Sequence, residues 1–387
     1  MYFDHNAGCR VRPEVATRLG DWLREPVANP SSLHEAGRRA RRGIEEARES
    51  VANLVGAEPD EVVFTSGGTE ANNLALGSML TPGAHLVSTE IEHSSILECA
   101  RGLERSGGAL TLVQPDSTGR IQVSSCTNAV LPGTRMVSVG WANGEIGVVQ
   151  PISAIVRGLR EVQSGILIHS DAVQAVGTLE VNFPESGLDL LSLSGHKLGA
   201  PAGIGALVIR RGTELTPSMF GGPQERERRG GTENVSGIIG FGLAASLARK
   251  ERAEHAARVA RLKDIVWGVL AAGIEGVRRL DLPDGLPGTL AVVLPGLRGD
   301  ALVAALDLRG VAVSTGSACA AGAPEPSHVL RAIGCDESSA RSGLRLSFGP
   351  ELTEANANEG ASAVVDVVRS AHARRARRVA SGVEDAA

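Results

Sequence analysis

The chain has 387 residues, of which 42% are hydrophobic and 21% are charged, and its formal net charge is -5. This composition is that of an ordinary globular protein, and the length suggests two to three domains. The negative charge argues against direct binding of nucleic acid. No apolar run approaches the roughly 20 residues that a membrane span needs, and the first residues lack the pattern of a signal peptide.

Five cysteines are present, and no two of them have the Cys-x-x-Cys spacing. They are Cys9, Cys99, Cys126, Cys319 and Cys335. The odd number and the spacing argue against a disulfide framework and against a closed zinc site. We therefore expect a cytoplasmic protein without a resident metal.

The first half of the chain alternates between strand and helix patterns. After an extended arm over residues 2–12, helices are predicted from residue 13 to about 22 and over 34–55, with a turn at 29–32 between them. Strands are predicted over residues 61–65, 85–89, 135–141, 165–170, 187–194 and 204–210, and further helices over 71–76, 94–101 and 152–162. This alternation predicts an α/β domain with a mostly parallel, doubly wound sheet.

Ligands of such sheets bind beyond the carboxyl ends of the strands. The residues of chemical interest that follow predicted strands are Gly68, His93, Asn143, Asp171 and Lys197. Their common position predicts one site at one edge of the sheet.

The turn Ser66–Glu70 lies between a predicted strand and a predicted helix and contains two glycines. Free amide groups and the positive end of the helix dipole would favour an anion there. An ordinary strand–helix loop has the same pattern. His93, in the next such connection, is either a helix cap or a residue that covers a ligand ring.

Lys197 and Asp171 indicate the chemistry. A lysine at a strand end can form a Schiff base with an aldehyde cofactor. A carboxylate on the neighbouring strand could keep a pyridine nitrogen protonated. The pair therefore suggests pyridoxal 5'-phosphate (PLP), whereas Ser194–Lys197 alone is also compatible with a surface turn and a solvated lysine.

The second half predicts a smaller α+β domain. A polar loop over residues 221–234, too irregular for a compact interior, precedes a bridging helix at 238–272. Strands are predicted at 289–294, 311–314 and 343–347, and helices at 300–308, 326–333 and 353–380. We expect a large domain over residues 12–255, a small domain made of residues 1–11 and 256–380, and a disordered tail at 381–387.

A cysteine lies in the middle of the small-residue loop at 314–326. A flexible loop suits a group that must travel, although an inert surface thiol is the alternative for Cys319. Arg345 on the next predicted strand could bind a carboxylate through two parallel hydrogen bonds, or could form a surface ion pair.

Several stretches occur together in the order found in one family: 29–32, 64–73, 89–93, 145–150, 171–174, 194–197, 229–235, 316–319 with 325–330, and 344–347. Over nearly its whole length, from Tyr2 to about Gly349, the chain resembles the cysteine desulfurases, which are class V aminotransferase-like, fold-type I PLP enzymes. The cysteine loop resembles that of the subgroup that feeds iron–sulfur and thiolation pathways.

The resemblance implies catalytic roles for three residues. Lys197 would bind the PLP aldehyde and later remove the substrate α-proton. His93 would stack on the cofactor ring and could take the substrate thiol proton. Cys319 would attack the sulfur of L-cysteine and keep it as a persulfide, releasing L-alanine.

The resemblance also implies binding roles. Asp171 would pair with the pyridine nitrogen and Gln174 with the phenolic oxygen, and Asn143 is counted with the cofactor residues. The phosphate would lie against four residues of its own subunit, Gly68, Thr69, Ser194 and His196. Thr232 would reach the phosphate of a partner subunit in a homodimer. Asn29 and Arg345 would bind the substrate.

The partners implied are L-cysteine, a second copy of the chain and a sulfur-acceptor or scaffold protein. Open alternatives are a PLP-dependent cysteine or selenocysteine lyase and a catalytically weak scaffold for sulfur acceptors. The sequence leaves open whether an iron–sulfur cluster contacts Cys319, and which pathway is served: iron–sulfur assembly, tRNA thiolation, DNA sulfur modification or a specialised metabolite.

The chain departs from the family pattern at several positions. Gly144 replaces an asparagine that normally contacts the cofactor, so we expect weaker or altered PLP binding unless Asn143 or water compensates. The arm Asn6–Cys9 replaces Asn-Ala-Thr-Thr, and Ala202 stands where a lysine is common. These changes suggest a specialised paralogue.

Overall fold

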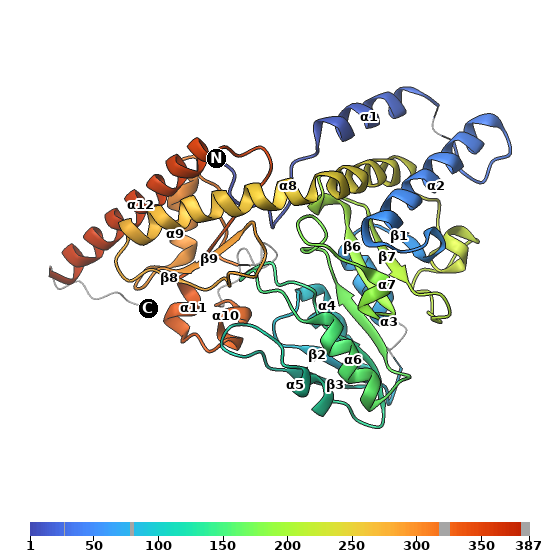
Figure 1. The fold of residues 1–387 in the computed structure, drawn as a ribbon, viewed down its shortest axis with the longest axis horizontal. Coiled ribbons are helices and arrows are strands. Elements are labelled where there is room, and N and C mark those ends of the chain that lie inside the picture. Colours follow the sequence, from blue (N-terminus) through green and yellow to red (C-terminus); the bar gives the residue numbers. More distant parts are fainter. Residues whose placement is uncertain (27, 78–80, 317–325, 381–387) are drawn as a thin grey trace.

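The computed structural model describes residues 1–26, 28–77, 81–316 and 326–380. Its main element is a seven-stranded sheet in the order β1-β7-β6-β5-β4-β2-β3 (Figure 1). The strands are β1 (Val62–Thr65), β2 (His85–Thr89), β3 (Ala109–Val113), β4 (Thr134–Ser138), β5 (Leu167–Asp171), β6 (Leu190–Ser194) and β7 (Gly205–Ile209). Only β7 runs against its neighbours, so the predicted mostly parallel sheet is confirmed.

Helices cover both faces of this sheet because successive strand residues point to opposite sides. Strand residues such as Val63 and Leu86 pack with α3 (Gly68–Gly77) and α4 (Ser94–Arg105). Their neighbours in sequence pack on the other face, against α2 (Glu35–Val55), α6 (Ile152–Val162) and the first half of α8 (Val235–Gly273). The sheet is therefore buried on both faces, as the continuous apolar strands require.

A second, smaller layer contains the antiparallel sheet β10-β9-β8. Its strands are β8 (Arg278–Arg279), β9 (Thr289–Val293) and β10 (Gly343–Ser347), and its helices are α9 (Gly299–Asp307), α10 (His328–Ala332), α11 (Glu337–Arg341) and α12 (Glu354–Ala380). The long helix α8 runs along both layers (Figure 1). Its second half shares a hydrophobic cluster with Phe3, β9, β10 and α12. The domain boundary near residue 255 stays a prediction.

The remaining short elements are α1 (Pro13–Arg24), α5 (Val123–Asn128), α7 (Phe183–Ser186) and the 3-10 turns η1 (Pro59–Glu61), η2 (Gly195–Lys197) and η3 (Gln224–Glu227). The sequence did not predict β3 or α5. The strand predicted at 311–314 is wrong, because this stretch makes only isolated bridges, Tyr2 with Ala312 and Ser314 with Arg345. The extended arm is confirmed: Tyr2 and Asp4 bridge to Ala312 and Ser347.

The polar loop at 221–234 is more ordered than expected, because Glu225 in η3 is buried. The tail at 381–387 and Cys319 lie outside the described residues. Within the described part of the chain, no helix is both long and apolar enough to cross a membrane.

Candidate active site

Residues from several strand ends meet at one edge of the large sheet. Asp171 and Ser194 are the last residues of β5 and β6, two adjacent parallel strands. Gly68 begins α3 shortly after β1, and His93 is the N-cap of α4 shortly after β2. This edge is the one at which ligands of doubly wound sheets bind.

The N-terminus of α3 forms a close-packed cradle. A Cβ atom at Gly68 would lie 2.8 Å from Val173 Cγ2 and 3.4 Å from Ser194 Cβ, so the position has no space for a larger residue. Thr69 is exposed in the first turn of the helix. Ser194 Oγ forms a 2.8 Å hydrogen bond with His196 Nδ1. Hydroxyl groups and free helix amides are groups that bind a phosphate.

Burial lowers the pKa of His196 to about 4, and Lys197 acts in the same direction. The His196 ring is therefore neutral at pH 7 and can serve the cradle as a hydrogen-bond partner without adding a positive charge.

Asp171 is held by two donors. The Val173 N–H donates to Oδ1 at 2.9 Å, and Asn72 Nδ2 donates to Oδ2 at 2.7 Å. Asn72 Nδ2 also donates to Ser95 Oγ at 2.8 Å. Both carboxylate oxygens therefore have defined directions, which suits a group that must face one ring nitrogen.

His93 caps α4 and is fixed by Ser95. The Ser95 N–H donates to His93 Nδ1 at 3.1 Å, and Ser95 Oγ lies 2.8 Å from the same nitrogen. Burial lowers the pKa of His93, Lys197 and His328 lower it further, and Asp171 raises it. The cap interpretation from the sequence is confirmed, and the ring also lies within electrostatic reach of Asp171 and Lys197.

The N-terminal arm contacts Lys197. Lys197 Nζ donates to the carbonyl oxygens of Asn6 and Ala7, the second at 3.0 Å. Gln174 Nε2 also donates to Asn6 O, at 3.0 Å. Two of the expected cofactor residues, Lys197 and Gln174, therefore donate hydrogen bonds to the same carbonyl oxygen, that of Asn6. The arm, whose sequence departs from the family pattern, lies directly beside Lys197.

Cys9 follows in the same arm. Its thiol donates to Lys197 O at 3.2 Å, and burial raises its pKa to about 11. This thiol stays protonated at neutral pH and is a poor nucleophile. A cavity of about 60 Å³ opens here, lined among others by Asn6, Cys9, Gln174 and Lys197.

Arg345 on β10 is buried, with 3% of its surface exposed. One guanidinium nitrogen forms a 2.6 Å ion pair with Asp4, and another donates to Gly144 O at 3.1 Å. Its Nε has no hydrogen-bond partner among the described residues. The alternative of a surface ion pair is therefore wrong, whereas substrate binding by Arg345 stays a prediction.

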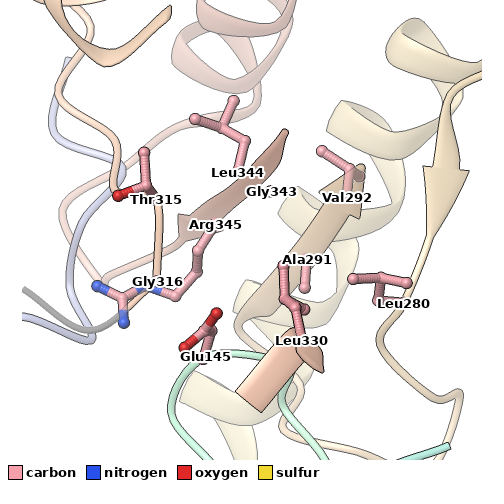
Figure 2. Close-up of a pocket in the computed structure, with 10 residues that line it drawn as sticks. All are labelled: Glu145, Leu280, Ala291, Val292, Thr315, Gly316, Leu330, Gly343, Leu344 and Arg345. Carbon is pink, nitrogen blue, oxygen red and sulfur yellow. The ribbon is translucent and has the colours of Figure 1, made fainter. Parts of the chain in front are cut away.

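A second buried charge, Glu145, lies beside Arg345 (Figure 2). Ser327 Oγ donates to its carboxylate, and a Cβ atom at Gly316 would lie only 2.8 Å from its carboxyl carbon. Burial raises the pKa of Glu145 to about 7, although the Ser327 hydrogen bond and the Arg345 charge both lower it. Glu145 thus joins residues on both sides of the segment 317–325.

Asn143 and Gly144 lie in a loop that contacts Ile91 and Gln174, and the cofactor role of Asn143 stays a prediction. Asn143 Nδ2 donates to Ile91 O, and its Oδ1 accepts the N–H groups of Glu145 and Ile146. A Cβ atom at Gly144 would lie 2.8 Å from Gln174 Nε2. The Gln174 side chain therefore occupies the space beside Gly144, and Asn143 stabilises its own loop.

Two predicted site residues, Asn29 and Thr232, make no contact with this edge among the described residues. Asn29 is exposed and its Oδ1 accepts the Ser31 N–H. Thr232 is exposed in the polar loop. Cys319 lies outside the described residues. Their roles stay predictions.

Three further residues of this edge, Asn72, Ser95 and Glu145, were not predicted from the sequence. Asn72 had a usable signal, because a buried helical face otherwise made of Ala71, Leu74 and Ala75 contains an asparagine. Glu145 gave no local signal, since its burial depends on β10 and on residues near 316 and 327.

The site fits PLP in its donor set. Gly68 presents backbone without a side chain at the N-terminus of α3, Lys197 offers an amine, and Asp171 offers an oriented carboxylate. These three groups match the phosphate, the aldehyde and the pyridine nitrogen of the cofactor.

Comparisons with known proteins agree with this geometry. A family model described as aminotransferase class-V matches residues 1–359. The IscS-like cysteine desulfurase of Mycobacterium tuberculosis is 40% identical over 394 residues, which cover 98% of this chain and 99% of that protein.

Two solved structures extend the likeness to the backbone. One titled NifS-like protein has a TM-score of 0.89 at 31% identity and covers 95% of this chain and 99% of its own. One titled SspA in complex with cysteine has a TM-score of 0.80 at 34% identity and covers 91% of this chain and 99% of its own.

Proposed function

This chain belongs to the aminotransferase class-V family, and we infer from that membership and from its relatives that it is a PLP-dependent cysteine desulfurase with a fold-type I architecture. We propose that it converts L-cysteine to L-alanine and leaves a persulfide on Cys319 for transfer to an acceptor protein. The observation that carries the proposal is the meeting of Lys197, Asp171 and the α3 N-terminus at one sheet edge.

Bound PLP supplies an aldehyde that captures amino groups and a ring that withdraws electrons from the substrate α-carbon. Lys197 would hold the aldehyde, Asp171 would pair with the pyridine nitrogen, and Gln174 would donate to the phenolic oxygen. Gly68, Thr69, Ser194 and His196 would hold the phosphate. The close packing around Gly68 and the Ser194–His196 hydrogen bond support this placement.

The substrate binds through its carboxylate at Arg345, with Asn29 nearby in the assembled enzyme. Arg345 is already oriented by Asp4 and by Gly144 O, so it loses little freedom when it binds. Lys197 takes the α-proton, and His93 takes the proton of the substrate thiol.

The Cys319 thiolate then attacks the substrate sulfur. A sulfur–sulfur bond forms, the carbon–sulfur bond breaks, and its electron pair passes to the substrate carbon, which is released as alanine after protonation. The product left on the enzyme is a Cys319 persulfide.

The active unit is a cytoplasmic homodimer, in which Thr232 of one subunit contacts the phosphate of the other. The exposure of Thr232 in the loop 221–234 is consistent with a contact outside its own subunit. The large domain spans residues 12–255, and residues 1–11 with 256–380 form the small one.

The test is to incubate the purified holoenzyme with L-cysteine without reductant, weigh the Cys319 peptide and quantify alanine. We expect one extra sulfur on that peptide with an equal amount of alanine, and loss of both in Cys319→Ser. Cys335→Ser is the matched control and should retain activity, because Cys335 follows α10, is not one of the proposed site residues, and has a thiol whose pKa is raised by burial. Pyruvate without peptide modification would favour a lyase, and no product despite bound PLP would favour a scaffold.

A further inference from the structure

Asn72 is a polar residue in an apolar layer. It lies on α3, its exposed fraction is 1%, and neighbouring residues such as Leu74 and Ala75 belong to a hydrophobic cluster. Burying an amide is unfavourable unless its hydrogen bonds are satisfied. A buried asparagine is therefore expected here only if its amide forms a hydrogen bond that an apolar residue could not form.

The Asn72 amide has a defined orientation. Nδ2 lies 2.7 Å from Asp171 Oδ2 and 2.8 Å from Ser95 Oγ. An ionised carboxylate only accepts hydrogen bonds, so the NH2 group must face Asp171. Oδ1 is then left buried without a hydrogen-bond partner in the described part of the chain.

An unsatisfied buried oxygen costs stability, which leucine, of similar shape, would avoid. Folding alone therefore does not explain Asn72. The feature that leucine could not replace is the NH2 group and its two acceptors.

The two acceptors lead to two residues of the proposed site. Asp171 is the proposed partner of the cofactor pyridine nitrogen. Ser95 Oγ accepts a hydrogen from Asn72, so its own hydrogen can be donated to His93 Nδ1. Because Nδ1 also accepts the Ser95 N–H, the neutral ring carries its proton on Nε2.

We propose that Asn72 is a positioning residue, which through one NH2 group orients the Asp171 carboxylate and, through Ser95, the His93 ring. The inference rests on the desulfurase function proposed above. The contact supports the cofactor at its nitrogen and its ring with a single side chain. It also keeps His93 in the neutral state that has its proton on Nε2. Before the ring can take a second proton at Nδ1, the hydrogen bonds that Nδ1 accepts from Ser95 must break.

The charged groups that act on His93 are Asp171 at the end of β5, Lys197 in η2 and His328 on α10. Burial and the hydrogen bonds from Ser95 favour the neutral ring, since hydrogen bonding to the neutral form disfavours the charged one. Loss of Asn72 would release Ser95 Oγ to accept a proton from the charged ring. Loss of the Ser95 hydroxyl would remove a donor to the neutral ring.

The main test compares Asn72→Leu with Asn73→Leu, its exposed neighbour, whose Nδ2 donates to Thr69 O within α3. The His93 pKa is followed in the apoprotein by histidine NMR, with the signal assigned through His93→Gln. We expect Asn72→Leu to raise this pKa by about 0.5 units or more, and Asn73→Leu to leave it unchanged.

The second readout is the affinity of the apoprotein for PLP, measured by its absorption. We expect a roughly tenfold weaker affinity in Asn72→Leu, the usual size of one lost hydrogen bond to a charged group. Denaturant unfolding of the apoprotein measures the accompanying change in stability, since the variant removes the donor to Asp171 Oδ2. An unchanged His93 pKa together with unchanged PLP affinity in folded Asn72→Leu would overturn the inference.

Ser95→Ala keeps the test decisive if Asn72→Leu does not fold. This variant keeps the hydrogen bond from Asn72 to Asp171 and loses the Ser95 hydroxyl that contacts His93 Nδ1. We therefore expect a raised His93 pKa with wild-type PLP affinity. A His93 pKa equal to that of the wild type would overturn the link. If the wild-type protein does not bind PLP, the proposed function fails. If the wild-type protein binds PLP and the variants change neither the His93 pKa nor the PLP affinity, only the role of Asn72 is contradicted.

Discussion

Glu145 shows how a single buried carboxylate makes stability depend on pH. Burial raises its pKa to about 7, from an ordinary value of 4.5. Between these values the folded protein binds a proton at this position that the unfolded chain has released. The contribution of Glu145 to stability is therefore largest below about pH 4.5 and is lost as the pH rises towards 7, by on the order of 3 kcal/mol.

Glu145→Gln should remove this dependence. We expect the variant, relative to wild type, to be more stable at pH 8 than at pH 5, as measured by urea unfolding at both values. The exposed Glu104→Gln on α4 is the control and should show the same difference at both pH values. A Glu145→Gln difference that is equal at pH 5 and pH 8 would contradict the assignment.

Gly144 is a second position at which a single added atom, a Cβ, would disturb the proposed site. A Cβ atom there would lie within 3.0 Å of Gln174 Nε2, Cδ and Cγ, so the Gln174 side chain must move. That movement would break its hydrogen bond to Asn6 O. We expect Gly144→Ala to bind PLP about threefold to tenfold more weakly, the effect of one displaced hydrogen bond.

Equilibrium binding of PLP to the apoprotein measures this effect. Gly165→Ala is the matched control, because a Cβ atom at Gly165 meets no atom within 4 Å. Gly144→Asn should be measured in parallel, since the family resemblance predicts a cofactor contact from its side chain that would offset the displacement of Gln174. Wild-type affinity in Gly144→Ala would show that Gln174 can move without consequence for the cofactor.

The turn η3 depends on a buried ion pair with α2. Glu225, Arg226 and Glu227 have φ angles of 46°, 57° and 64°, which are unfavourable for residues other than glycine. Arg48 on α2 forms two hydrogen bonds with the Glu225 carboxylate, which also accepts the Phe64 N–H. Both side chains of the pair are 2% exposed. The pair therefore holds the loop 221–234, which contains Thr232, in a strained conformation.

Breaking this pair should be costly because one charge remains buried. We expect Arg48→Met and Glu225→Gln each to lower the free energy of unfolding by about 3–5 kcal/mol. The double variant should cost clearly less than the sum, because neither charge is left alone. Urea unfolding of all four proteins gives the coupling. Asp300→Asn, in the exposed pair with Arg298, should change stability little, and strict additivity at positions 48 and 225 would disprove the coupling.

The surface of the chain suggests where the proposed partner subunit would bind. Phe220 is 83% exposed and Met219 is 42% exposed. A Cβ atom at the next residue, Gly221, would lie 3.1 Å from Gly230 Cα, so these apolar residues adjoin the stretch with Thr232. Large exposed apolar side chains beside a proposed intersubunit loop are typical of an interface.

We expect the wild-type protein to sediment at twice the subunit mass of 40.0 kDa, and Phe220→Asp to dissociate at low concentration and to bind PLP more weakly. Analytical ultracentrifugation with a parallel PLP titration measures both. Leu308→Asp is the control, since Leu308 is 89% exposed after α9, in the smaller layer. A fully active wild-type monomer would exclude the proposed contact of Thr232 with a partner subunit.

The sequence by itself determined the order of strands and helices and the position of Lys197, Asp171, His93 and Gly68 at strand or helix ends. These features depend on local patterns: apolar runs, glycine turns and capping residues within a few positions of one another. It did not determine β3, and it predicted a strand at 311–314 where only isolated bridges form. Both stretches lie at a sheet edge, β3 in the large sheet and residues 311–314 beside β10 in the small one, where pairing depends on distant partners.

Only the tertiary structure decided which polar groups are buried and what they contact. Asn72 meets Asp171 across 99 positions, Arg345 meets Asp4 across 341, and Glu145 meets Ser327 across 182. A local sequence pattern cannot predict contacts between residues so far apart in the chain. Their effect also depends on burial, since a low-dielectric interior changes the pKa and the hydrogen-bond energy of the same side chains. The chemical groups of the site were thus predictable from single residues. The orientation of these side chains and the shifts of their pKa values follow from the packing.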